Sequence, residues 1–422
     1  LSTQEVCTLF MNKLRILYVC RLFNGFETSV KLKKWDPTGV PTIYRMINAL
    51  NMSENHNVKL VITQKSHNKD LIIPYLSKIN FKKFDSSVIA LSAINLTYLP
   101  KLGRLFQEFF HICTVIVLLF KKKYSCMYAD NANLYIAAIV SRLRIVPVVF
   151  RVMGVYPAMR DIVNKKGVKN AFLKWCYGSP FSLVVCTQDG SGVEPWIERA
   201  INPNTPVHIL INGVENYNMQ PGENYNVFEK FSIPRDKFII LFLGKLEKIK
   251  GIYDFIDGFK IANKILDNFL HAVVVGHGEE YYKIRNAIKD YNSVTLIPRI
   301  PHSEIFQFHN IADIYVSTNR LANLTNANLE SMSSGSCMII PSSQNDTYVD
   351  IETDKLLTNN AVYRIQYPPS KQHVSDAIVF LFNHPELREK LSSNAYNESR
   401  KFISSWDFRI KKELTIIEGV LI

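Results

Sequence analysis

In this 422-residue chain, two lysines that follow an apolar run ending in glycine have the types and spacing to do chemistry. The segment is FLGKLEKIKG at 242–251, in which Gly244 ends the run and Lys245 and Lys250 follow it. Glycine lets a ligand approach the backbone closely, and two ammonium groups can neutralise a diphosphate. The alternative is that both lysines are solvated surface residues.

A single carboxylate stands out in a second polar segment, NANLESMSSG at 326–335. Thr325 or Asn326 can cap a helix that starts here, and the free N–H groups of a helix start favour an anion. Glu330 lies about one turn further on, where its two oxygens suit the vicinal hydroxyls of a ribose. The alternative role of Glu330 is that of a partner of the helix dipole.

Two further loops hold candidate residues in the first half of the chain. Gly39 follows Thr38 just before a helical pattern and can belong to a phosphate or substrate loop, although the segment is not GxGxxG and gives little support to a dinucleotide site. Arg151 and Gly154 lie in VFRVMGVYP, where a strand is predicted to end at the same edge of the sheet.

These residues must be positioned by strands and helices that alternate along the chain. Apolar runs predict strands in the first half at 14–20, 58–64, 87–92, 124–130, 146–154, 181–187 and 206–213. A second cycle predicts strands at 237–245, 271–278, 293–299, 312–318 and 337–343. Strands that alternate with helices indicate doubly wound parallel sheets, in which ligands bind at the carboxyl ends of the strands.

The two cycles are separated by a segment rich in Asn, Pro and Gly, at 212–226, as linkers often are. We therefore expect an α/β protein with two Rossmann-like domains, at 1–215 and 216–400. The amphipathic tail at 401–422 is expected to be a helix that packs back toward the N-terminal domain.

The charge of the chain is uneven. Residues 1–200 hold 27 Lys and Arg against 12 Asp and Glu, whereas residues 201–422 hold 23 against 25. A basic half suggests an anionic partner, either nucleic acid or an acidic membrane surface. The chain has no RNP, zinc-finger or helix-turn-helix signature, which argues against nucleic acid. No DxD-type carboxylate pair is placed to hold a metal.

One apolar segment, EFFHICTVIVLLFKKKY at 108–124, has two interpretations. Its apolar part is about 12 residues, short of the ~20 that span a bilayer. It is either a helix that covers a sheet or a helix that dips into a membrane interface. In the second case Lys121, Lys122 and Lys123 meet lipid phosphates.

The seven cysteines are scattered at 7, 20, 113, 126, 176, 186 and 337. None forms a CxxC pair, which predicts reduced core thiols and a cytosolic location. The first ten residues lack the basic start and apolar core of a signal peptide. MNKLRILYVC, from Met11, looks like a cytosolic start, so residues 1–10 are either an upstream extension or part of the natural chain.

Taken in order, these segments resemble retaining glycosyltransferases of the GT-B fold, specifically glycosyltransferase family 4. The likeness is strongest over 207–406, where ILINGVE, VVVGHGEE and NANLESMSSGSCMIIP are similar to the family's NGVD, VGDGPE and LEAMACGxPVV segments. In the first half it is carried mainly by VVFRVMGVYP and VVCTQDGS. The resemblance implies two domains that face a cleft, with the acceptor on the N-terminal one and the donor on the C-terminal one.

The resemblance also implies roles for the candidate residues. Lys245, Lys250 and Arg151 are the expected catalytic residues, with the two lysines on the donor diphosphate, and Glu330 holds the ribose. The remaining donor-binding candidates are Asn326, Ala327, Thr325, Gly244 and Gly39. No metal or cofactor is expected apart from the nucleotide sugar. One departure is Ala322, where the family often has a glutamate that touches the transferred sugar; Asn323 or Arg320 can substitute for it.

The expected function is transfer of a sugar, with retention, from a nucleotide-diphosphate sugar to a saccharide or lipid-linked acceptor in bacterial surface polysaccharide assembly. The enzyme is expected in the cytoplasm, with peripheral contact to anionic membrane and none with nucleic acid. The alternatives are a nucleotide-sugar 2-epimerase, a phosphorylase, for which no pyridoxal lysine can be assigned, and a non-catalytic nucleotide-sugar-binding protein.

Overall fold

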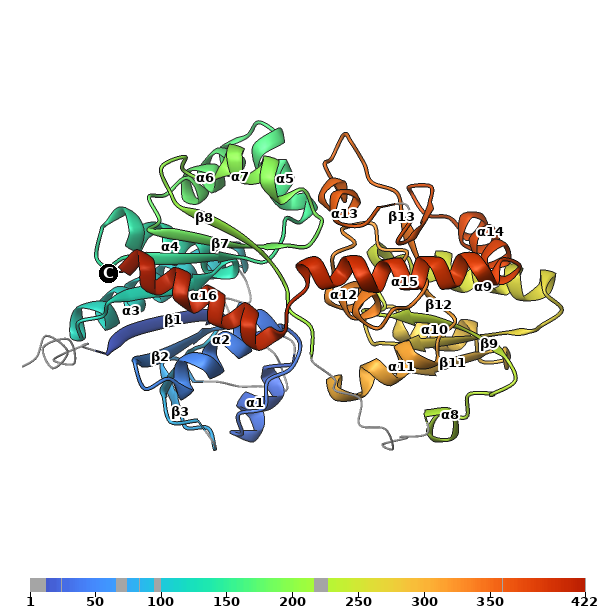
Figure 1. The fold of residues 1–422 in the computed structure, drawn as a ribbon. Helices are drawn as coiled ribbons and strands as arrows, with labels where there is room; N and C mark the ends of the chain where they lie inside the picture. The colour runs from blue at the N-terminus through green and yellow to red at the C-terminus, as the bar shows by residue number, and fades with distance from the viewer. Residues whose placement is uncertain are drawn as a thin grey trace, which may run out of the picture.

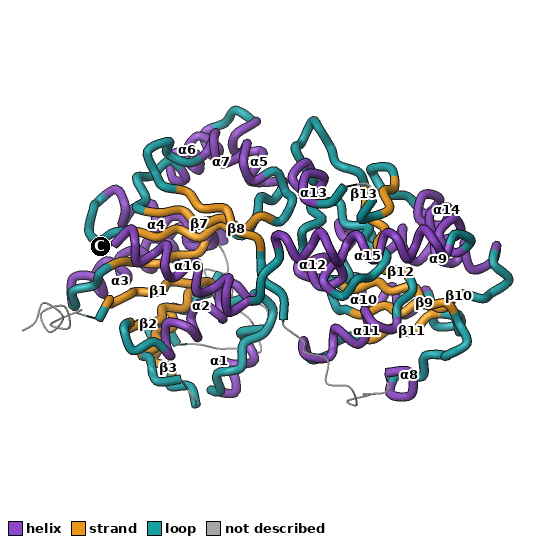
Figure 2. Tube along the Cα trace, in the orientation of Figure 1, coloured by secondary structure: helices purple, strands orange, loops and turns teal. Residues whose placement is uncertain are grey.

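The chain forms two α/β halves, each built on its own twisted sheet (Figure 1). The computed structural model describes residues 13–23, 25–65, 74–82, 84–94, 100–215, 227–358 and 360–421. Cys7 and the segments 1–12 and 216–226 therefore lie outside the described residues. Figure 2 shows strands at the centre of each half with helices on both sides of them.

The N-terminal sheet has eight strands in the order β3-β4-β2-β1-β5-β6-β7-β8. Its strands are β1 (Leu14–Arg21), β2 (His56–Thr63), β3 (Ser77–Ile79), β4 (Ser87–Leu91), β5 (Cys126–Asp130), β6 (Val148–Val152), β7 (Leu183–Gln188) and β8 (Val207–Ile211). All neighbours are parallel except β3, which pairs antiparallel with β4 at the edge. The predicted parallel sheet is confirmed, with one short edge strand that the sequence did not indicate.

The C-terminal sheet has six parallel strands in the order β11-β10-β9-β12-β13-β14. Its strands are β9 (Phe238–Leu243), β10 (Leu270–Val275), β11 (Val294–Ile297), β12 (Ile314–Val316), β13 (Met338–Pro341) and β14 (Tyr363–Ile365). Strand β14 was not predicted. Strands β9 and β12 lie side by side, so the loops that follow them emerge next to each other at the carboxyl edge.

Helices cover both faces of the two sheets. In the N-terminal half they are α1 (Glu27–Leu32), α2 (Pro41–Met52), α3 (Pro100–Lys121), α4 (Leu134–Arg142), α5 (Pro157–Asn164), α6 (Val168–Tyr177) and α7 (Val193–Ala200). The next are α8 (Val227–Lys230), α9 (Ile252–Ile265), α10 (Tyr281–Ala287), α11 (Ile305–Ile311), α12 (Asn326–Ser333), α13 (Ile351–Leu356), α14 (Lys371–Phe382), α15 (Pro385–Phe402) and α16 (Trp406–Leu421).

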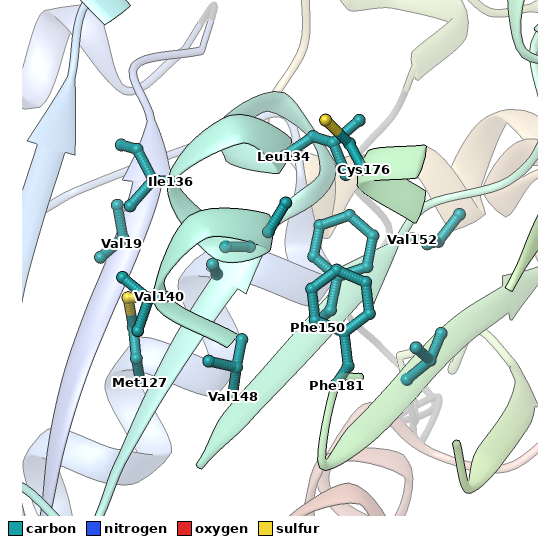
Figure 3. Packing of buried hydrophobic residues seen from close by; sticks show 14 of the residues in the cluster. Val19, Met127, Leu134, Ile136, Val140, Val148, Phe150, Val152, Cys176 and Phe181 are labelled. Carbon is teal, nitrogen blue, oxygen red and sulfur yellow. The ribbon is translucent and has the colours of Figure 1, made fainter. Parts of the chain in front are cut away.

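One face of the N-terminal sheet packs against α3, α4, α6 and α7, and Figure 3 shows part of this core. Val140 of α4 lies near Met127 and Val148 of the strands, and Phe150 stacks on Phe181 with ring centroids 4.6 Å apart. Strands covered on both faces are apolar along their whole length, which is why they were predicted from apolar runs. Of the six described cysteines, five are buried and Cys113 is half-buried, and all six are free thiols.

The chain crosses between the halves twice, at adjacent places. The first crossing follows β8, and the second joins α15 to α16, which runs back over the N-terminal half (Figure 1). Val214 donates its N–H to the carbonyl of Ser404 at 3.0 Å, and Trp406 donates to the carbonyl of Val214 at 3.1 Å. Helix α16 then packs against α2 and buries Trp406 and Ile410 in the core.

Helix α3 is longer than the apolar part of about 12 residues that the sequence indicated. It spans 22 residues, Pro100–Lys121, because the residues before the apolar run continue the helix. Its inner face, with His111, Val115 and Leu119, is buried against the sheet layer. Its outer face remains exposed, so the helix covers the sheet and also presents apolar side chains to the outside.

Candidate functional site

Loops at the carboxyl ends of strands from both sheets meet between the two halves. Asp189 and Gly190 follow β7 and contact the loop behind β12 and the start of α13. Leu324 donates its N–H to the Asp189 carbonyl at 3.0 Å, and the Asp350 N–H bonds the Gly190 carbonyl at 2.6 Å. The two domains are therefore closed onto each other at the edge where ligands of parallel sheets bind.

Lys250 is held at this edge by a short turn behind β9. The turn is a single 3-10 turn, Lys248–Lys250, which ends at Gly251 with a left-handed φ of 72°. A side chain on Gly251 would collide with Thr318, whose hydroxyl donates to the carbonyls of Lys250 and Gly251 at 3.0 and 2.9 Å. The backbone of Lys250 is thus fixed against the loop behind β12.

The ammonium group of Lys250 is affected both by burial and by neighbouring charges. Burial lowers the pKa of its ammonium, and Lys245 adds to this, whereas Asp189 and Glu247 oppose it. Asp189 belongs to the N-terminal half, so Lys250 lies on the side of its domain that meets the N-terminal half. Lys245, in contrast, is exposed and lies 3.8 Å from Glu247. The structure therefore distinguishes the two predicted lysines, with Lys250 enclosed and Lys245 at the surface.

Gly244 lies where a ligand can approach the backbone. Its φ is 153°, and a Cβ built on it would meet no atom within 4 Å, so the space beside it is open. The neighbouring Gly276, behind β10, could carry no side chain, because its Cβ would fall 1.8 Å from the Gly244 carbonyl oxygen. The two loops can pack this closely only with glycine at Gly276.

Helix α12 begins with a side-chain cap, as predicted. Thr325 accepts a hydrogen bond from the Asn328 N–H at 3.4 Å. The N–H groups of Asn326 and Ala327 belong to the first turn, which has no carbonyl partner within the helix. The Asn326 side chain accepts from Asn212 at 2.7 Å, which ties the start of α12 to the first interdomain crossing.

Glu330 is buried in α12, and its carboxylate faces a histidine. Oε1 lies 2.8 Å from Nε2 of His302, in the 3-10 turn His302–Glu304, although the atoms are not aligned as a good hydrogen bond. His302 also lies 3.8 Å from Glu215, which pairs with Arg45 of α2. The Glu330 carboxylate is thus at the end of a short series of side-chain contacts, through His302 and Glu215 to Arg45, that spans both halves.

Arg151 was predicted to face the cleft, and this is wrong. Its side chain is 1% exposed and lies 3.2 Å from Glu413 of α16. Glu413 also accepts from Arg409 at 2.6 Å and from the Tyr128 hydroxyl at 2.5 Å. Burial alone would raise the pKa of Glu413, but Arg151 and Arg409 bring it below its usual value. Arg151 therefore fastens α16 to the sheet, and it does not reach a substrate.

The structure also places three other candidate residues, which are Gly39, Arg320 and Asn323. Gly39 lies in the exposed loop before α2, with a φ of 104°. Arg320 pairs with Asp254 at 2.6 Å, and Asn323 is fully buried against Asp350. Neither Arg320 nor Asn323 is therefore free to replace the glutamate absent at position 322.

The residues missed from the sequence are Asp189 and His302. Asp189 had a usable signal, since it is a carboxylate directly behind an apolar strand, where site residues gather. His302 had none, because it becomes relevant only through the packing of its turn on α12. In the described part of the chain, no group of three or more His, Cys, Asp and Glu side chains is arranged to hold a metal ion.

Comparison with known proteins finds a family match in the C-terminal half. Residues 224–398 match the family model of Glycosyl transferases group 1. An uncharacterized glycosyltransferase of Methanocaldococcus jannaschii is 22% identical over 231 residues, which cover 53% of this chain and 55% of that protein. The aligned part thus spans about half the length of this curated relative.

The whole fold is similar to solved structures at low sequence identity. Sucrose-phosphate synthase from Thermosynechococcus elongatus has a TM-score of 0.68 at 14% identity, covering 96% of this chain and 99% of its own. Anabaena HepE in complex with UDP has a TM-score of 0.64 at 13% identity, covering 96% and 100%. WaaG, a glycosyltransferase involved in lipopolysaccharide biosynthesis, has a TM-score of 0.61 at 12% identity, covering 96% and 100%.

These neighbours define the fold as that of GT-B glycosyltransferases, with two Rossmann-like domains that face each other. Within it, residues 224–398 match the family model of Glycosyl transferases group 1.

Proposed function

We propose that the protein is a retaining glycosyltransferase of the family 4 type, which moves a sugar from a nucleotide-diphosphate sugar to a saccharide or lipid-linked acceptor. The observation that supports this is that Lys250 and Glu330 follow neighbouring strands of the matched domain. Lys250 lies in the turn after β9, and Glu330 lies in α12, which follows β12. HepE, one of the fold neighbours, has been solved with UDP and with UDP-glucose. Both observations support donor binding by this domain.

The proposed chemistry is electrostatic. Cleavage of the bond between sugar and diphosphate leaves negative charge on the leaving group and an oxocarbenium-like sugar. Lys250, Lys245 and the first N–H groups of α12 stabilise the leaving charge, and such preorganised charges often dominate catalysis. Closure of the two domains excludes water and limits hydrolysis of the donor. This scheme requires no metal and no further cofactor.

Glu330 gives the first test of the donor site. Wild-type protein should show a raised melting temperature with one family of UDP-, GDP- or ADP-sugars, since a ligand at 100 times its Kd stabilises the native state by about 2.7 kcal/mol. Glu330→Gln should lose most of this shift, because the amide has only one oxygen that can accept a hydrogen bond, whereas the carboxylate has two. Glu389→Gln, an exposed change on α15, is the matched control and should keep it. An equal shift in Glu330→Gln would refute the ribose-binding role.

A second candidate function is nucleotide-sugar binding without transfer, and Ala322 is the observation that favours it. The side chain at this position is buried and has no polar group. Incubation with radiolabelled donor but no acceptor separates the candidates. Slow hydrolysis indicates a transferase, epimer formation indicates a 2-epimerase, and an unchanged donor that still shifts the melting temperature indicates a binding protein.

For the acceptor, we propose a lipid-linked saccharide reached from the cytoplasmic face of the membrane, in surface polysaccharide assembly. In the described residues, one helix is long and apolar enough to cross a membrane, at Leu102–Lys121, with 28% of the segment buried. Its inner face packs on the sheet, so the helix could span a bilayer only if the core opened. Seven large apolar side chains point outward and are 42–74% exposed: Leu102, Leu105, Phe106, Phe109, Phe110, Val117 and Phe120.

The basic residues at the end of α3 complete this surface. Lys121, Lys122 and Lys123 are all exposed directly behind the apolar face. Burial lowers the pKa of the nearby Lys59, and the charges of Lys122, Lys78 and Lys121 lower it further, which shows how closely the cations gather. Apolar side chains flanked by lysines are typical of a surface that lies in an anionic membrane interface.

Vesicle binding tests this surface. We expect wild-type protein to sediment with anionic vesicles at low salt, and the doubly substituted Phe109→Ser, Phe120→Ser variant to bind at least about 10-fold more weakly, since each exposed ring contributes apolar area. The control is Tyr282→Ser, which should bind normally. Tyr282 is 67% exposed and lies on α10 of the other domain. Wild-type protein that stays in the supernatant would contradict the proposed membrane contact.

A further inference from the structure

The position of Ala322 leaves the transferred sugar without its expected carboxylate, and the structure offers a replacement from the other domain. Ala322 is 3% exposed and lies in the loop behind β12. Two acidic residues contact the backbone of this loop. The Asp350 carboxylate accepts from the Asn323 N–H, and the main-chain carbonyl of Asp189 accepts from the Leu324 N–H. This inference rests on the proposed function, because it concerns the sugar part of the same donor.

Asp350 is fully used by the fold. One carboxylate oxygen accepts from the Asn323 N–H at 2.7 Å and from the Thr353 hydroxyl at 2.8 Å, and the other accepts from the Asn323 side-chain amide. Its side chain is 1% exposed, and burial raises its pKa to about 6. Asp350 therefore shapes the loop and has no oxygen left for a substrate.

Asp189 is held by the fold through one oxygen. Oδ1 accepts from the N–H of Ser191 at 3.0 Å and from its hydroxyl. Oδ2 receives no hydrogen bond from any other described residue. A Cβ on Gly154 would fall 2.0 Å from Oδ2, so the glycine leaves room for the carboxylate at the ends of β6 and β7.

The surroundings of Asp189 place it against the donor site. Its carbonyl accepts from Leu324, two residues after Ala322, and it is half-buried. Burial raises the pKa of its carboxyl, and the charge of Lys250 opposes this. The carboxylate is thus near both the cation assigned to the diphosphate and the loop that lacks the glutamate.

We propose that Asp189, through Oδ2, accepts a hydrogen bond from a hydroxyl of the transferred sugar in place of the glutamate absent at position 322. The group that recognises the sugar then comes from the N-terminal domain, so recognition requires the closed arrangement of the two domains. A carboxylate at this place repels a second carboxylate, which makes the donor a neutral sugar and excludes a uronic acid.

The test compares turnover with binding of the bare nucleotide. For Asp189→Asn, we expect kcat/KM for the preferred donor to fall about 10- to 100-fold, the loss typical of a hydrogen bond to a charged group. Binding of the nucleoside diphosphate without sugar should be unchanged, because the sugar contact is absent from it. Adding Ala322→Glu to Asp189→Asn should restore part of the turnover, which a merely structural role would not predict.

Two results with Asp189→Asn would overturn the inference and leave the proposed function intact. They are full turnover, or a loss of nucleoside diphosphate binding equal to the loss of turnover. Should Asp189→Asn fail to fold, wild-type protein supplies the second measurement. A uronic acid donor that competes as well as the neutral sugar of the same nucleotide would also overturn it. Wild-type protein that binds no nucleoside diphosphate would instead refute the proposed function, and this inference with it.

Discussion

Lys250→Ala is expected to lower kcat/KM by about 100-fold or more, the cost typical of removing one group that stabilises charge in the transition state. Lys250 is half-buried where the domains meet, and burial lowers the pKa of its ammonium, so its charge is less screened by water than that of an exposed lysine. The measurement is steady-state transfer or donor hydrolysis, with the nucleotide identified by thermal shift.

Lys245 and Lys248 provide the matched comparison for this variant. Both are exposed lysines in the same segment. Lys245→Ala should cost about 10-fold or less, because its charge is screened by water, and Lys248→Ala should be near neutral. Equal losses in all three variants would show that the net charge of the segment matters more than the enclosed position of Lys250.

A steep loss of stability between pH 6.5 and pH 5 is the second large effect that we expect. His111, His271 and His309 are 0%, 4% and 3% exposed, and burial lowers their pKa values to about 4, 4 and 3. The unfolded chain has the ordinary histidine pKa near 6.5 and so binds more protons in this range. The stabilising contribution is therefore complete above about pH 6.5 and is lost as the pH falls.

The expected loss of stability between pH 7 and pH 5 follows from the difference in proton binding between the folded and unfolded chains. At pH 5 each histidine contributes about 2 kcal/mol of destabilisation relative to pH 7, or about 6 kcal/mol for the three. Asp350, with its pKa raised to about 6, is protonated first in the folded state and offsets about 1 kcal/mol of this. The remainder is comparable to the whole stability of many domains. Chemical unfolding at a series of pH values measures it.

His309→Phe isolates one of these contributions. Both ring nitrogens of His309 lack a hydrogen-bond partner, and its ring packs 5.5 Å from that of Tyr315. Phenylalanine keeps the ring contact and cannot be protonated, so the loss of stability between pH 7 and pH 5 should shrink by about 2 kcal/mol. His208→Gln, at an exposed position, should leave the curve unchanged. An unaltered pH dependence in His309→Phe would contradict the assignment.

The long buried strands could be predicted from the sequence, and the short edge strands could not. Strand β9 is apolar along its length because both of its faces are covered, so its pattern is visible in isolation. Strands β3 and β14 have three residues each, too few for a pattern. For α3 the sequence was insufficient for another reason. Its apolar run indicates a helix but does not show which side of the helix faces outward.

The candidate site could be predicted only where its residues act through local geometry. Gly244 and Lys250 directly follow one strand, and the capping bond of α12 joins residues only three positions apart. Both features could therefore be predicted from the sequence. Arg151 follows a strand in the same way, but its partner Glu413 is 262 residues away, and only the packing of α16 shows that the guanidinium points inward. Asp189 was visible as a carboxylate behind a strand, yet its nearness to Ala322 depends on how the two domains meet.

The two adjacent crossings make the C-terminal domain a removable cassette inserted in the N-terminal one. Its entry at Val214 and its exit at Trp406 are joined by backbone hydrogen bonds, and Gly213 is so close to Trp406 that a Cβ there would lie 2.6 Å from its backbone. A single cut at each crossing would therefore release the C-terminal domain without breaking either sheet. C-terminal domains from related chains could be exchanged at this junction while the N-terminal half stays the same.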